Sequence, residues 1–140
     1  MPRLFALGLS LVLCSASAMA QMPAGSPFDG RWLVVLACPP STDGALPFTW
    51  RFYADVRGGV LHGEYGTVGQ PASMSLDGRI QPDGLAQLVA QGLTGVSAYN
   101  VNQAARGIPF RNDVPARFDT NRGAGNWVYR RTCEFSFTRQ

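Results

Sequence analysis

The sequence predicts an all-β fold, and within that class an antiparallel up-and-down barrel of about eight strands. Three observations point to it. Apolar and polar residues alternate along several segments, turn-forming residues recur about every 8 to 12 residues, and no segment has the apolar spacing of a long helix. The same observations fit a two-sheet β-sandwich, so the choice between barrel and sandwich stays open.

Residues 1–20 have the three parts of a secretory signal peptide. Arg3 supplies a positive charge, a short apolar run follows it, and Ala18-Met19-Ala20 is a small-x-small cleavage site. We expect cleavage near Ala20-Gln21 and a periplasmic or secreted protein. A lipoprotein processed at Cys14 is the alternative, but a leucine rather than a small residue precedes that cysteine.

The rest of the chain is expected to form one domain. Residues 21–27 are interpreted as a flexible leader and residues 28–140 as a single β-barrel domain. No further apolar run is long enough to span a membrane. The net charge is +3 and every positive side chain is an arginine, but no dense basic cluster occurs. We therefore expect no nucleic-acid partner.

Cys38 and Cys133 are the two cysteines that remain after signal cleavage. An even pair in an oxidising compartment predicts a disulfide. That bond would bring the first and last strands side by side and close the barrel seam. These cysteines and His62, the one histidine, have no metal-ligand spacing, so we expect neither a metal nor a cofactor.

The first predicted strand runs from about residue 31 to 38 and has apolar residues on both faces. A loop with turn-forming residues, 39–44, follows it. The next strand, residues 48–57, has the clearest alternation in the chain. Its apolar face consists of Phe48, Trp50, Phe52, Ala54 and Val56.

Gly58-Gly59 predicts a tight hairpin turn after this strand, because glycine adopts the positive φ angles that such turns need. The turn sets the register of the returning strand. It places Asp55 opposite His62 and Tyr53 opposite Glu64, with Leu61 and Tyr65 on the buried face.

Another hairpin is predicted from residues 73–80 and 86–91, joined by the turn at 81–84. Gly78 interrupts the inward row of the first of these strands, which suggests a bulge or a bend. Residues 92–109 are harder to interpret, because Tyr99 and Val101 fit a short strand while 96–106 also fits one or two helical turns.

The C-terminal part is expected to hold two further strands. Residues 114–118 alternate, but Pro115 favours an edge or a bulge. Residues 120–125 form a glycine-rich turn. The last strand is predicted from about Trp127 to Arg139.

The segment Gly30-Arg31-Trp32 at the start of the first strand resembles the opening of calycin-like barrels, such as the lipocalins, the avidins and bacterial protease inhibitors of similar size. The resemblance implies that Trp32 closes one end of the barrel beneath an arginine from near the last strand. Either Arg131 or Arg139 could serve. It implies a fold and leaves the ligand open.

Two sets of residues are candidates for a site. Inward aromatic residues could line a ligand cavity, although aromatic rows on strands usually form core; the candidates are Trp50, Phe52, Tyr65 and Trp127. An exposed polar cluster could perform acid–base chemistry, although ordinary surface charge pairs explain it as well; its members are Tyr53, Asp55, His62 and Glu64.

We therefore expect an exported, non-enzymatic β-barrel that binds a small apolar or amphipathic ligand. The alternative is an envelope interaction module with a solid core, such as a protease inhibitor or accessory subunit, whose partner is an envelope protein contacted by residues 21–30 and 39–47. A hydrolase using His62 is the third hypothesis.

Overall fold

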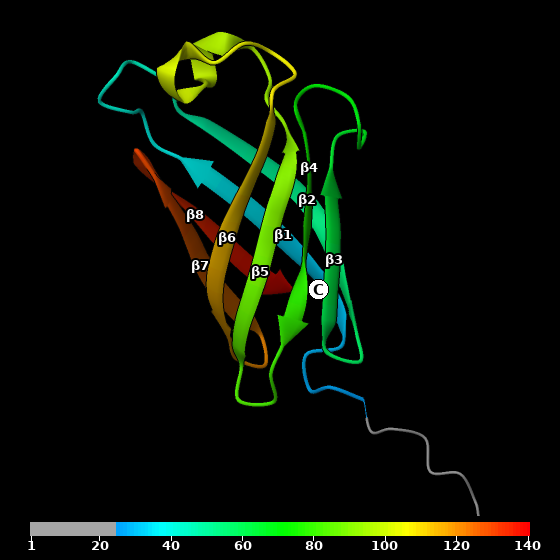
Figure 1. Ribbon diagram of the computed structural model, residues 1–140. Coiled ribbons are helices and arrows are strands. Elements are labelled where there is room, and N and C mark those ends of the chain that lie inside the picture. The colour runs from blue at the N-terminus through cyan, green and yellow to red at the C-terminus, as the bar shows by residue number, and fades with distance from the viewer. Residues whose placement is uncertain (1–24) are drawn as a thin grey trace, which may run out of the picture.

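The computed structural model describes residues 25–140 and shows an all-β, closed antiparallel barrel of eight strands. Each strand pairs with the next along the chain, and β1 pairs with β8 to close the ring (Figure 1). The barrel alternative is thus confirmed over the sandwich. The expected signal peptide lies outside the described residues. The strands are β1 (Gly30–Cys38), β2 (Phe48–Arg57), β3 (Val60–Tyr65), β4 (Ser73–Ile80), β5 (Leu85–Leu93), β6 (Pro109–Phe118), β7 (Arg122–Tyr129) and β8 (Arg131–Arg139).

Strand β1 lies between β2 and β8, and it is paired along most of its length on both sides. Its inward face, Trp32, Val34 and Leu36, is fully buried. Cys38 at its end is bonded to Cys133 near the start of β8, with 4.3 Å between the two Cα atoms. The predicted disulfide therefore links the first strand covalently to the last.

The β2–β3 hairpin follows the register that Gly58-Gly59 predicts. Both glycines have positive φ angles, 57° and 78°, and Asp55 pairs with His62. The ladder ends at Ala54 and Gly63, however, so the expected pairing of Tyr53 with Glu64 does not form. Beyond this point β2 continues with β1 as its only partner.

Gly78 does not mark a bulge. The ladders on both sides of β4 run through it without interruption, with Leu61 opposite on β3 and Leu88 on β5. A Cβ atom at Gly78 would clash first with the backbone carbonyl oxygen of Gln87, and it would also lie 2.6 Å from a methyl carbon of Leu88. The glycine is therefore explained by the close approach of β5, through both its backbone and the Leu88 side chain.

The single predicted strand over residues 127–139 is wrong. The chain reverses at Arg130, which has a φ of 56°, and forms two paired strands, β7 and β8. The expected glycine-rich turn at 120–125 is shorter, because β7 already begins at Arg122. The alternation of residues continues unchanged across the turn, because a turn centred on one residue places residues of the same parity, such as Trp127 and Cys133, opposite each other. The alternation therefore gives no sign that the strand ends.

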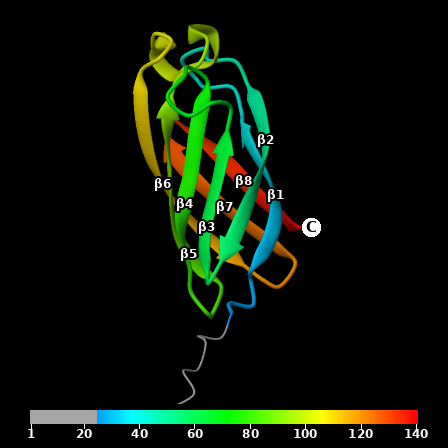
Figure 2. The same cartoon turned by 90° about the vertical axis from the view of Figure 1, so that its right-hand side faces the viewer.

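Residues 94–108 form a cap over one end of the barrel rather than a strand. The cap contains two short 3₁₀ turns, η1 (Ser97–Tyr99) and η2 (Val101–Gln103). It lies at the opposite end from the described N-terminal residues (Figures 1 and 2). Among residues 25–140, no helix is of a length and hydrophobicity that could cross a membrane.

Candidate ligand pocket at one end of the barrel

One end of the barrel interior is packed with buried aromatic side chains. The sealed end is defined here by five residues: Phe28, Trp32, Phe118, Phe137 and Arg139. The Trp32 and Phe118 rings meet edge to face with centroids 5.4 Å apart, and Phe118 contacts Phe137 at 4.7 Å. Trp32 is 0% exposed, and its indole Nε1 donates a hydrogen bond to the carbonyl oxygen of Phe28 at 2.9 Å.

Arg139 covers the sealed end. Its guanidinium carbon lies 5.0 Å from the Trp32 ring centroid. It donates hydrogen bonds to the carbonyl oxygens of Asp29 at 2.8 Å and Thr120 at 2.6 Å, and to that of Pro27. Gly30 beside it has a φ of 133°, a backbone conformation that favours glycine. Arg139 rather than Arg131 therefore lies over Trp32, and the described end of the expected leader, residues 25–27, is held against the barrel.

The opposite end of the interior is hollow. A pocket of about 860 Å³ lies between the barrel strands and the cap, within the usual range for small-molecule sites. The open end is defined here by the inward side chains around this pocket: Phe48, Trp50, Tyr65, Phe110, Trp127 and Arg131.

The pocket exists because two ladders stop short of this end. The β2–β3 ladder ends at Ala54 and Gly63, and the β6–β7 ladder covers only three residue pairs, ending at Ala116 and Gly125. Pro115, which has no N–H to donate, is the next residue of β6 toward the open end. The strands are free to separate there, so inward aromatic rings do not meet in the middle.

The rings of the open end pair around the wall instead. Trp50 stacks on Tyr65 with centroids 4.3 Å apart and planes 9° from parallel, bridging the gap between β2 and β3. Phe110 contacts Trp127 at 6.1 Å across the gap between β6 and β7. Phe48, Trp50, Tyr65 and Phe110 remain only partly buried. They present aromatic faces to an empty volume.

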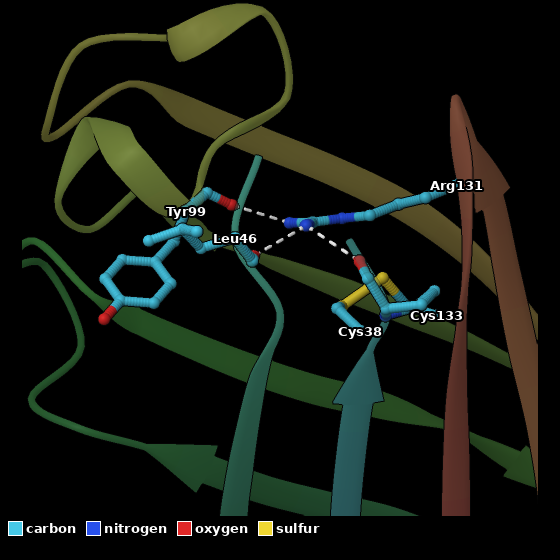
Figure 3. Close-up of a disulfide and its surroundings, with 6 residues drawn as sticks. Cys38, Leu46, Tyr99, Arg131 and Cys133 are labelled. Atoms are coloured by element: carbon cyan, nitrogen blue, oxygen red, sulfur yellow. Dashed lines mark hydrogen bonds between the residues drawn. A yellow bond between two sulfur atoms is a disulfide. The ribbon is translucent and has the colours of Figure 1, made fainter. Parts of the chain in front are cut away.

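Arg131 ties the cap to the barrel. It donates hydrogen bonds to the carbonyl oxygens of Pro39 and Leu46, both at 3.1 Å, and to that of Tyr99 at 2.7 Å (Figure 3). Partial burial lowers the pKa of its guanidinium from the ordinary arginine value. Arg131 on β8 therefore joins the loop between β1 and β2 to the cap, beside the disulfide.

Further hydrogen bonds hold the cap in place. The Leu46 amide donates to the carbonyl oxygen of Ala98 at 2.9 Å, and the Asn102 amide donates to the Asp43 carboxylate at 2.7 Å. The side chain of Arg130 donates to the Asn102 side-chain oxygen at 2.8 Å. These three hydrogen bonds hold the cap at Ala98 and Asn102, in addition to the bond from Arg131.

The structure brings together three of the four predicted ligand-binding residues. Trp50, Tyr65 and Trp127 line the pocket. Phe52 does not, because it is only 7% exposed and lies in the core below Tyr65. Phe110 and Arg131 also line the pocket, although they are not among the residues predicted from the sequence. Phe110 has the same parity as Val114 and could have been found from the alternation of β6.

The predicted polar cluster lies on the outer face of the barrel, away from the pocket, and its partners differ from those expected. His62 contacts Asp77 of β4 through Nδ1, and Glu64 through Nε2 at 3.2 Å. The hydrogen bond to Asp77 raises the pKa of His62, against a smaller opposing effect of burial. Tyr53 stacks under the Arg31 guanidinium at 4.1 Å.

This outer cluster is a set of surface charge pairs. The side chains of His62 and Glu64 are 55% and 53% exposed. Residues 25–140 contain no group of three or more His, Cys, Asp or Glu side chains arranged to hold a metal ion. Comparison of the chain with models of known protein families, with curated proteins and with solved structures finds no match.

Proposed function

We propose that this protein is an exported, non-enzymatic β-barrel that binds one small apolar or amphipathic ligand in the open end. The observation that carries this proposal is the contrast inside a single barrel. A pocket of about 860 Å³ walled by partly buried aromatic rings lies at one end, and buried aromatic rings pack on one another at the sealed end. Apolar faces left beside an empty volume favour an apolar guest, because its binding removes them from water.

The chemistry of the wall supports binding rather than catalysis. The pocket is lined by aromatic, aliphatic, amide and hydroxyl side chains and by two arginines, with no histidine, carboxylate or cysteine among the described lining residues. General acid–base catalysis near neutral pH draws chiefly on histidine and carboxylates. The pocket also favours this proposal over the interaction module with a solid core.

The proposal includes export and a calycin-like relationship. The disulfide fits an oxidising compartment. Trp32 beneath Arg139, at the start of β1, is the arrangement that the Gly30-Arg31-Trp32 resemblance implies for the closed end of such a barrel. A small eight-stranded barrel of this kind has room for one small ligand.

Titration with N-phenylnaphthylamine, a neutral probe whose fluorescence rises in apolar surroundings, tests the proposal. We expect saturable binding at one probe per protein, weakened several-fold by Trp50→Ala. Tyr53→Ala, which removes an aromatic ring from the outer wall, is the matched control and should bind as the unchanged protein does. Absence of saturable binding, or equal loss in both variants, would overturn the proposal.

A further inference from the structure

The wall of the pocket carries charge of one sign only. Among the described lining residues the charged side chains are Arg111 and Arg131, and no aspartate or glutamate joins them. Arg111 is exposed and its guanidinium contacts Gln91 of the neighbouring strand at 3.4 Å. Arg131 is therefore the cation that belongs to the pocket itself.

Arg131 is partly buried and has the inward parity of Cys133 and Phe135 on β8. Its guanidinium carbon lies 5.1 Å from the ring centroid of Phe48, one of the aromatic residues of the wall. The head group of Arg131 thus lies where the aromatic wall meets the cap.

No carboxylate of the described residues forms an ion pair with Arg131. Its three hydrogen-bond acceptors are neutral carbonyl oxygens. In residues 25–140 the only side-chain ion pairs involve His62. Asp43 is the acid that acts on Arg131, from beyond ion-pair distance, and its carboxylate already binds Ser41 and the Asn102 amide. A partly buried cation with neutral partners is a favourable place for an anion.

We propose that the ligand is an amphipathic anion, with an apolar body among the aromatic rings and a carboxylate or similar anionic head at Arg131. This inference rests on the proposed function and narrows its ligand class. The aromatic wall supplies apolar contact for the body of the ligand, and the Arg131 guanidinium, which has no ion-pair partner among the described residues, favours an anionic head. A hydrogen bond between charged partners is stronger than one between neutral partners, so selection is expected even though Arg131 also holds the cap.

Three probes with one apolar body and different heads test the inference: para-hexylbenzoate, para-hexylbenzyl alcohol and para-hexylbenzylamine. Calorimetry at neutral pH and low salt should show the carboxylate binding about ten-fold more tightly than the alcohol, and the amine most weakly. If the alcohol and the carboxylate bind equally, or the amine binds best, the anionic head is wrong while the pocket stands. If none of the three binds, the proposed function fails with it.

Substitutions separate the charge of Arg131 from its role in holding the cap. The measured quantity is the ratio of carboxylate to alcohol affinity, which a general loosening of the cap does not change. Arg131→Gln should bring the affinity ratio close to one. Arg131→Lys cannot donate to all three carbonyl oxygens but keeps the positive charge, so it should retain most of the preference for the carboxylate.

Arg51→Gln is the matched control, because Arg51 lies beside Trp50 on β2 but is exposed on the outer face and is not part of the pocket wall. The change removes the same charge and should leave the ratio as it is. An equal fall of the ratio in Arg51→Gln and Arg131→Gln would mean that net charge alone is responsible, and would overturn the assignment to Arg131.

Discussion

The two ends of this barrel are built from the same kinds of residue and have opposite interiors. Each end has inward aromatic rings and one arginine from β8 that donates to three carbonyl oxygens, Arg139 at the sealed end and Arg131 at the open end. At the sealed end the rings pack on one another and Trp32 is fully buried. At the open end they stand around a pocket.

The difference lies in the backbone rather than in the side chains. Toward the sealed end β2 is paired with β3, and β6 with β7, and the inward rings contact one another. Toward the open end both ladders have ended and the wall widens. Whether an aromatic row forms core or cavity is therefore decided by how far the neighbouring strands stay hydrogen-bonded.

The largest effect is expected from removing the central ring of the sealed end. Trp32→Ala should lower the free energy of unfolding by about 3–5 kcal/mol, because it leaves a cavity in a filled core. Trp50→Ala, the same change at the open end, should cost only about 1 kcal/mol because that ring already borders empty space. Urea unfolding followed by circular dichroism measures both. Equal losses would mean that the two ends are packed alike.

Removal of the disulfide should have the next largest effect. Cys38 and Cys133 are separated by 95 positions, so replacing both with serine frees a long loop in the unfolded chain and should cost about 2–4 kcal/mol. The disulfide lies beside Arg131, which holds the cap, so its loss should loosen the cap. Amide hydrogen exchange should therefore accelerate more in residues 94–108 than at Trp32. Unchanged unfolding midpoints with and without reductant would contradict this expectation.

The two arginines should differ in what their loss affects. Arg139→Met leaves three carbonyl oxygens of the sealed end without their donor and should cost about 1–3 kcal/mol of stability. Arg131→Met should cost less, because other hydrogen bonds still hold the cap. Its main effect should be faster hydrogen exchange in the cap. The reverse order of stabilities would show that the cap, rather than the sealed end, limits unfolding.

The smallest effect is expected on the outer wall. The folded protein raises the pKa of His62 above its unfolded value, so its stabilising contribution is complete below that value and is lost as pH rises through the folded pKa. Because His62 and its partners are about half exposed, the contribution should be only a few tenths of a kcal/mol.

His62→Gln should therefore flatten the stability profile between slightly acidic and alkaline pH. The variant should leave binding of N-phenylnaphthylamine unchanged, because His62 lies outside the pocket wall. A large loss of binding would mean that the outer cluster is coupled to the open end, contrary to this prediction.

Local signals in the sequence predict the fold, the disulfide and one hairpin register. The alternation of apolar and polar residues identifies β2, and Gly58-Gly59 sets the register of β3 against β2. Both signals arise from residues close together in the sequence. The predicted count of about eight strands is confirmed, but the eight strands are not all the predicted ones. Residues 94–108 form a cap instead of a strand, and the single strand expected at the C-terminus is two strands that meet at Arg130.

The pocket could be anticipated only in part. Trp50, Tyr65 and Trp127 are recognisable as inward aromatic residues, but their exposure depends on where the ladders end, which no local pattern encodes. Asp77 was missed as the partner of His62 because the register of β4 against β3 is set by the loop at 66–72, whose conformation the sequence does not define.

The three tryptophans provide the most direct test, because Trp32 is at the sealed end and Trp50 and Trp127 are at the open end. Their indole N–H signals can be followed by ¹H–¹⁵N NMR during titration with para-hexylbenzoate, after assignment with single Trp→Phe variants. We predict saturable shifts of the Trp50 and Trp127 signals and an unmoved Trp32 signal. Shifts of Trp32 as large as those of the other two, or no shift in any of them at high probe concentration, would contradict a barrel sealed at one end and open to a ligand at the other.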